Sequence, residues 1–384
     1  MESPASQKFC VFLALPMRRA WSPFDHHSHQ FAQLAMKATD LMTLAIEMNA
    51  SDLHLNPGRP PVGRVDGKLI HLEEGDLSDE NTLALCKELC DERHWAELEE
   101  VGTTDIGLAH NSGNRFRVSC MRQRGRYTAI LRLIPNELLT FDQIGLPETV
   151  QDLLRRPRGL VLVTGPTGSG KSTTLATMID WININFDRHI VTIEDPIEFY
   201  HSHKRGLVTQ REVGSDVPDF AEAMRRVLRQ DPDVILLGEM RDLETISSAI
   251  TAAETGHLVF GTLHTTGSAR TVNRMIDAFP ANQQEQIRAQ LSVSLVAVVS
   301  QVLMPHASGK GRVAGFEVMI NNPAISNLIR KNETNKIQST LQTSRRMGMM
   351  TLDDHLLELA KSGNITPRTA LDYAQNSKEL EARL

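Results

Sequence analysis

The feature that most constrains the fold is a glycine-rich loop directly after an apolar run. Residues 160–164 read Leu-Val-Leu-Val-Thr, and residues 165–172 read Gly-Pro-Thr-Gly-Ser-Gly-Lys-Ser. The spacing G-x-x-x-x-G-K-S between a buried strand and a helix is typical of a phosphate-binding loop. Its glycines let consecutive backbone N–H groups turn toward an anion, and the following helix adds its positive N-terminal end. The sequence therefore predicts a nucleoside triphosphate site in an α/β fold.

Every residue of this loop is a candidate nucleotide contact. Lys171 supplies a positive charge for the β- and γ-phosphates, and the Ser172 hydroxyl is a candidate Mg²⁺ ligand. The predicted nucleotide-binding residues are Gly165, Pro166, Thr167, Gly168, Ser169, Gly170, Lys171, Ser172, Thr173 and Glu194.

Strand and helix patterns alternate after residue 159. Continuous apolar strands in such an alternation favour a buried parallel sheet. The expected strands are 160–164, 190–194, 233–237 and 258–262, and the expected helices are 170–184, 219–229 and 242–254. Beyond residue 265 the pattern is mostly helical, with a further strand pair near 299–304 and 313–319.

Acids and a histidine follow three of the expected strands. Ligands of open parallel sheets lie beyond the carboxyl ends of the strands, so these side chains are expected near the Lys171 loop. Glu239 is expected to hold Mg²⁺, in part through water. Glu194 and Glu198 are the candidates for orienting and deprotonating a water molecule. His264 follows the last of these strands.

The 384-residue chain divides by pattern into several regions. We expect a disordered extension over 1–32, an α+β domain over 33–135, a linker over 136–158 and the α/β domain over 159–384. Within the first domain, the pattern indicates one acidic helix over 78–100.

Composition argues against several classes of protein. The net charge is −6, and no basic groove with interleaved aromatic residues is visible, so no nucleic acid partner is expected. No run approaches the roughly 20 apolar residues of a membrane helix. The four cysteines lack the spacing of a zinc site and are expected to be reduced thiols.

Four ordered motifs resemble those of the secretion-superfamily ATPases, which drive type IV pili and type II secretion. The resemblance extends from Ser51 to about residue 375, and it is greatest to the pilus retraction (PilT-like) branch. The motifs are Walker A over 165–172, the aspartate box over 192–199, Walker B over 228–242 and the histidine box over 255–266.

The resemblance implies roles for individual residues. Glu198 matches the catalytic glutamate, Glu239 the Walker B glutamate, and Arg117 and Arg132 the first-domain arginines that reach the γ-phosphate. Two histidine-box residues match those that couple the phosphate site to neighbouring domains. The implied catalytic set is Glu198, Glu239, Lys171, Arg117, Arg132, His264 and His257.

The resemblance also implies an architecture and an activity. It implies a RecA-like P-loop core, a PAS-like N-terminal domain and a ring-shaped homohexamer. The implied activity is hydrolysis of ATP with Mg²⁺ to power pilus retraction in twitching motility. The implied location is the cytoplasmic side of the inner membrane at the pilus base, against the platform protein, without a membrane span.

Two features bear on the subtype. The chain lacks the zinc-binding tetracysteine insert of assembly ATPases, which favours retraction. The retraction branch carries Ala-Ile-Arg-Asn-Leu-Ile-Arg near its C-terminus, and Ser326 replaces the first arginine here. Ile325, Leu328 and Ile329 of this helix serve either partner docking or core packing. An accessory subunit that assists a related motor, or a nucleic-acid translocase, remain alternatives.

Overall fold

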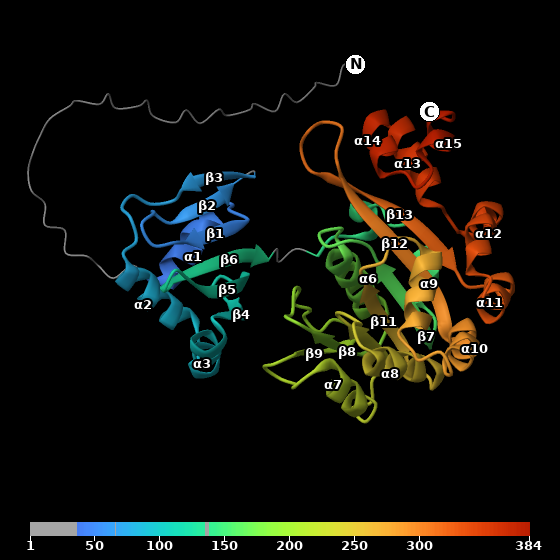
Figure 1. The fold of residues 1–384 in the computed structure, drawn as a ribbon, viewed down its shortest axis with the longest axis horizontal. Coiled ribbons are helices and arrows are strands. Elements are labelled where there is room, and N and C mark those ends of the chain that lie inside the picture. The colour runs from blue at the N-terminus through green and yellow to red at the C-terminus, as the bar shows by residue number, and fades with distance from the viewer. Residues whose placement is uncertain (1–36, 66, 135–137) are drawn as a thin grey trace, which may run out of the picture. The chain divides into compact units, whose positions relative to one another are not determined.

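Two β-sheets carry the fold in this computed structural model, which describes residues 37–65, 67–134 and 138–384 (Figure 1). The first sheet is antiparallel throughout and has the strand order β3-β2-β1-β6-β5-β4. The second sheet has the order β13-β12-β7-β11-β10-β8-β9 and is parallel except at β12–β13. The extension predicted for 1–32 lies outside the described residues.

The first sheet and its helices occupy the N-terminal part of the described chain. The strands are β1 (Asp52–Leu55), β2 (Val62–Val65), β3 (Lys68–His71), β4 (Thr103–Ala109), β5 (Arg115–Gln123) and β6 (Arg126–Ile134). The helices are α1 (Ala38–Glu47), α2 (Asp79–Leu89) and α3 (Glu92–Val101). This mixture of strands and helices confirms the predicted α+β pattern.

The acidic helix predicted over 78–100 is two helices. Cys90 follows α2 with ψ 136°, which no helical residue adopts. Asp91 then begins α3 as its N-cap, and its Oδ1 accepts the His94 N–H at 2.8 Å. Aspartate competes for backbone donors in this way and favours a helix start over a helix interior.

The second sheet and its helices follow. The strands are β7 (Gly159–Thr164), β8 (His189–Glu194), β9 (Leu207–Glu212), β10 (Val234–Leu237), β11 (Leu258–Leu263), β12 (Leu295–Pro305) and β13 (Arg312–Ile320). The helices up to β12 are α4 (Phe141–Ile144), α5 (Thr149–Leu154), α6 (Lys171–Asn185), α7 (Phe220–Val227), α8 (Leu243–Glu254), α9 (Ser268–Asp277) and α10 (Gln284–Ser294). The later helices are α11 (Pro323–Arg330), α12 (Ile337–Thr343), α13 (Leu352–Lys361), α14 (Pro367–Tyr373) and α15 (Ser377–Glu381), with short 3₁₀ turns at Thr334–Lys336 and Arg345–Met347.

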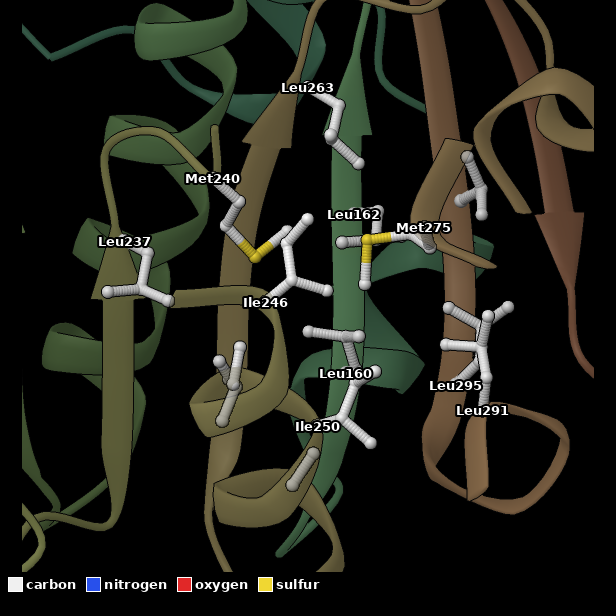
Figure 2. Packing of buried hydrophobic residues seen from close by; sticks show 14 of the residues in the cluster. Leu160, Leu162, Leu237, Met240, Ile246, Ile250, Leu263, Met275, Leu291 and Leu295 are labelled. Carbon is white, nitrogen blue, oxygen red and sulfur yellow. The ribbon is translucent and has the colours of Figure 1, made fainter. Parts of the chain in front are cut away.

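Helices cover both faces of the second sheet. In β7, Leu160 and Leu162 join a core cluster with α8 residues such as Ile246, and Figure 2 shows these side chains together. Val161 and Val163 belong to a second cluster, which contains the apolar residues of α6. Burial on both sides explains why the parallel strands are continuous apolar runs.

The segment predicted as a linker contributes to this second core cluster. Phe141, Val150 and Leu154 are at most 5% exposed and belong to the same cluster as Val161. The part of the segment that the structure describes is therefore packed against the second sheet.

Candidate active site

The phosphate loop joins β7 to α6 as predicted. Gly165, Gly168 and Gly170 have φ angles of 146°, 77° and 88°, and Gly170 is the N-cap of α6. A Cβ atom at Gly165 would collide with the backbone oxygen of Gln301, so glycine is required there for space as well as conformation. The loop therefore has the backbone freedom that an anion cradle needs.

Lys171 lies half-buried over the loop. Its Nζ donates hydrogen bonds to the backbone oxygens of Gly165 at 3.0 Å and Pro166 at 3.1 Å. Burial lowers the pKa of Lys171, and the charges of Glu239 and Glu198 oppose that shift. These charges bring the lysine and the two predicted acids into one electrostatic cluster.

Gln301 supports the loop from the neighbouring strand β12, and sequence reasoning missed it. Its Nε2 donates to the backbone oxygen of Ser169 at 2.5 Å, and the residue is 2% exposed. Among the described residues, Ser169 Oγ and Gln301 Oε1 are buried without a hydrogen-bond partner. Buried polar atoms normally have partners. The Ser169 hydroxyl can donate a hydrogen bond to a phosphate oxygen, whereas Gln301 Oε1 can only accept one, so only Ser169 Oγ fits a bound phosphate.

Glu194 ends β8 and is largely surrounded by protein. Its Oε1 accepts the Thr192 hydroxyl at 2.7 Å and lies 3.4 Å from Gln210 Nε2. Its Oε2 lies 3.4 Å from the backbone nitrogen of Glu198. Burial raises the pKa of Glu194 to about 7, against the effect of these hydrogen bonds. Glu194 thus contacts the backbone of the loop that carries Glu198.

Glu239 follows β10 and contacts a histidine from the next strand. Its Oε1 lies 2.9 Å from His264 Nε2 and 2.5 Å from Arg241 Nε. Burial acts to raise the pKa of Glu239, but hydrogen bonds from Arg241 and His264 outweigh it and hold the pKa below its usual value. Glu239 is therefore an anion at neutral pH, as a ligand for a hydrated cation must be.

His257 lies at the other end of β11 from His264. Its Nδ1 lies 3.0 Å from the backbone oxygen of Ala252. The six residues of β11 separate the two histidines, which corresponds to roughly 20 Å of extended chain. His264 follows the carboxyl end of β11, on the side of the phosphate loop, whereas His257 precedes the amino end of the same strand. The geometry therefore gives no support to a contact between His257 and the phosphates.

Arg117 and Arg132 are direct cross-strand partners on β5 and β6. Arg132 Nε donates to Asp52 Oδ1 at 2.9 Å within the first sheet. Arg115 lies two residues before Arg117 and therefore shares its face of β5. Arg115, one of the arginines that surround Arg117 and Arg132 in the sequence, is 5% exposed and pairs with Glu212 of β9. The alternating Arg-Phe-Arg pattern was the signal that both arginines face the same way.

The described ranges contain neither a preassembled metal-binding cluster nor a helix that could span a membrane. No group of three or more His, Cys, Asp or Glu side chains there could hold a metal ion. Ser172 and Glu239 remain the predicted Mg²⁺ ligands, and Mg²⁺ completes its shell with water and phosphate oxygens in sites of this kind. None of the described helices is both long and apolar enough to cross a membrane.

Comparison with known proteins identifies the family. The sequence family described as "Type II/IV secretion system protein" matches residues 27–366. The "Type IV pilus retractation ATPase PilT" of Pseudomonas aeruginosa is 47% identical over 340 residues, which cover 88% of this chain and 98% of that protein. A "Twitching motility protein" of Neisseria gonorrhoeae is 46% identical over 320 residues, which cover 83% of this chain and 86% of that protein.

A solved structure gives the same result for the fold. The crystal structure of the pilus retraction motor PilT with bound ADP superposes with a TM-score of 0.85 at 47% identity. The match covers 90% of this chain and 99% of that chain. The chain therefore belongs to the type II/IV secretion system protein family, on the branch of the type IV pilus retraction ATPases.

Proposed function

We propose that this ATPase powers pilus retraction by hydrolysing ATP at the carboxyl ends of the strands of the second sheet. The residues that act there are Lys171, Glu198, Glu239 and His264. The observation that carries this proposal is the phosphate loop itself, where Lys171 Nζ lies 3.0 Å from the backbone oxygen of Gly165 and 3.1 Å from that of Pro166. The loop N–H groups and Lys171 bind the β- and γ-phosphates. Glu198 orients the attacking water and accepts its proton.

Ser172 and Glu239 are the residues that would hold Mg²⁺. Arg241 and His264 both contact Oε1 of the Glu239 carboxylate, so we assign Oε2 to the hydration shell of the cation. When bound, Mg²⁺ supplies positive charge to the β- and γ-phosphate oxygens. His264 holds the Glu239 carboxylate in place through its 2.9 Å contact.

Arg117 and Arg132 are proposed to approach the γ-phosphate from the first sheet. An arginine there stabilises the negative charge that develops on the transferred group. We further propose a ring-shaped homohexamer on the cytoplasmic side of the inner membrane, which acts on the pilus through the platform protein. The match to a retraction motor over 99% of that chain supports this assignment.

The test uses Glu198→Gln, with Glu244→Gln on the exposed face of α8 as the control. We expect Glu198→Gln to lower the ATPase rate by about a hundredfold or more while ATP binding persists, because only the general base is lost. The control should keep the wild-type rate. A Glu198→Gln enzyme with a near-normal rate would remove Glu198 from the mechanism.

A cellular assay tests the motor role itself. In a strain deleted for its own retraction ATPases, the wild-type chain should restore retraction and Lys171→Ala should not. Ser326 Oγ lies 2.8 Å from the backbone oxygen of Ser292, so the unusual serine of α11 is used in packing against α10. Ile325 and Ile329 are fully buried in the core and Leu328 is partly buried against it, which supports packing as their role. Restoration that requires a second motor would establish the accessory role instead.

A further inference from the structure

Arg115 is the buried arginine that the mechanism above does not use. It lies on β5 of the first sheet and is 5% exposed. Its Nη2 donates to Glu212 Oε2 at 3.1 Å, although Glu212 belongs to β9 of the second sheet. Burial lowers the pKa of Arg115, and the charges of Glu212, Glu194 and Asp216 oppose that shift. A cation this deeply buried needs a strong reason to be there.

The surroundings form a socket for the guanidinium. On one side lies Gly107 of β4, where an added Cβ would collide with Arg115 Nη2 and lie 3.2 Å from its Cζ. The ring of Tyr200 also packs on the group, with its centroid 4.1 Å from Cζ. Arginine stacks on aromatic rings in this way because its plane is broad and weakly hydrated. The socket therefore selects arginine by shape as well as by charge.

Glu212 connects this socket to the catalytic loop. The oxygen that accepts Arg115, Oε2, also accepts the backbone N–H of Ile197 at 3.0 Å. Ile197 directly precedes Glu198, and Tyr200 lies two residues after Glu198. Arg115 thus reaches the loop at two points, by a charge-assisted hydrogen bond through Glu212 and by stacking on Tyr200.

We propose that Arg115 is a positioning residue, which holds the loop of Glu198 in its catalytic geometry through Glu212 and Tyr200. The inference rests on the proposed role of Glu198 as the base. Because Arg115 comes from the first sheet, the loop keeps this geometry only while that sheet remains in contact with it. Small displacements of a reacting group cost large factors in rate, so the coupling belongs in kcat.

The experiment is a double-mutant cycle on the full chain with Arg115→Gln, Glu212→Gln and both together. We expect each single variant to lower kcat roughly tenfold with KM for ATP within about twofold, and the double variant to be no slower than either. The control is Arg126→Gln, which removes an exposed arginine of β6 that pairs with Asp79. Losses that multiply in the double variant, or a KM effect without a kcat effect, would overturn the proposal.

Gly107→Ala tests the same socket without removing a charge. The new methyl displaces the guanidinium, so kcat should fall as it does in Arg115→Gln. Tyr200→Phe should keep the wild-type kcat because it retains the ring, whereas Tyr200→Ala should lower it. If Arg115→Gln does not fold, Glu212→Gln and Gly107→Ala decide the matter. Unchanged kcat in both would refute the positioning role, while an active Glu198→Gln enzyme would refute only the base assignment.

Discussion

Gln301 illustrates at the scale of one residue how a distant strand supports the phosphate loop. Its side-chain amide donates a hydrogen bond to the buried backbone oxygen of Ser169. Gln301→Ala therefore removes this hydrogen bond and leaves the Ser169 oxygen without its donor. Such a loss is worth about 1–2 kcal/mol, and the loop must be ordered to bind phosphate. We expect ADP affinity, measured by isothermal titration calorimetry, to weaken roughly tenfold.

The matched control for this prediction is Gln290→Ala. Gln290 lies on α10 and donates to Glu254 Oε2 at 3.0 Å, so the same amide is removed at a site without a loop contact. ADP affinity should be unchanged in this variant. An ADP affinity in Gln301→Ala within twofold of wild type would show that the loop does not depend on β12.

The reach of sequence reasoning differs among the residues of the site. Lys171, Glu198, Glu239 and His264 follow strands within recognisable motifs, so their meeting point could be predicted from parallel-sheet geometry. Gln301 could not be found in this way. It lies more than 130 positions from Ser169, and a contact between separate strands leaves no local pattern.

At the scale of elements, the same contrast appears among the strands. β7 and β11 match their predicted ranges within one residue, because burial on both faces makes each a continuous apolar run. β9 (Leu207–Glu212) was not predicted. It is an edge strand with four consecutive polar residues, Thr209, Gln210, Arg211 and Glu212, and only its pairing with β8 shows that it is a strand.

Helix α8 offers a test at this scale. Asp242 is its N-cap, with Oδ1 accepting the Thr245 N–H at 2.8 Å and Oδ2 accepting the Thr245 hydroxyl at 2.7 Å. Loss of such a cap costs about 1–2 kcal/mol, and α8 packs Ile246 and Ile250 into the core. We expect Asp242→Ala to lower the melting temperature and Asp242→Asn to restore most of it.

Asn376→Ala provides the comparison, because Asn376 caps the five-residue helix α15 near the C-terminus. A short terminal helix contributes less to the core, so the melting temperature should fall less in Asn376→Ala than in Asp242→Ala. Equal shifts of the melting temperature in the two variants would show that the N-cap of α8 stabilises the protein no more than the N-cap of α15 does.

At the scale of the whole molecule, His355 makes stability depend on pH. It lies on α13, and its Nδ1 accepts the backbone N–H of Phe316 of β13 at 2.9 Å. Burial lowers the pKa of His355 from 6.5 to about 4. The unfolded chain therefore takes up a proton near pH 6.5 that the folded chain resists until about pH 4. The contribution of neutral His355 to the free energy of unfolding is fully present above pH 6.5. It is lost as pH falls through this window, by roughly 3 kcal/mol.

His355→Gln separates this contribution from those of other groups. The variant has no proton to gain at this position, so its melting temperature should fall less than that of wild type between pH 6.5 and pH 4. His71→Gln, at an exposed position on β3, should keep the wild-type pH dependence. Burial lowers the pKa of His201 to about 4 as well, so part of the loss should persist in His355→Gln. Only the neutral His355 ring can accept the Phe316 N–H. If the melting temperatures of His355→Gln and wild type fell in parallel with pH, this hydrogen bond would not be the source of the pH dependence.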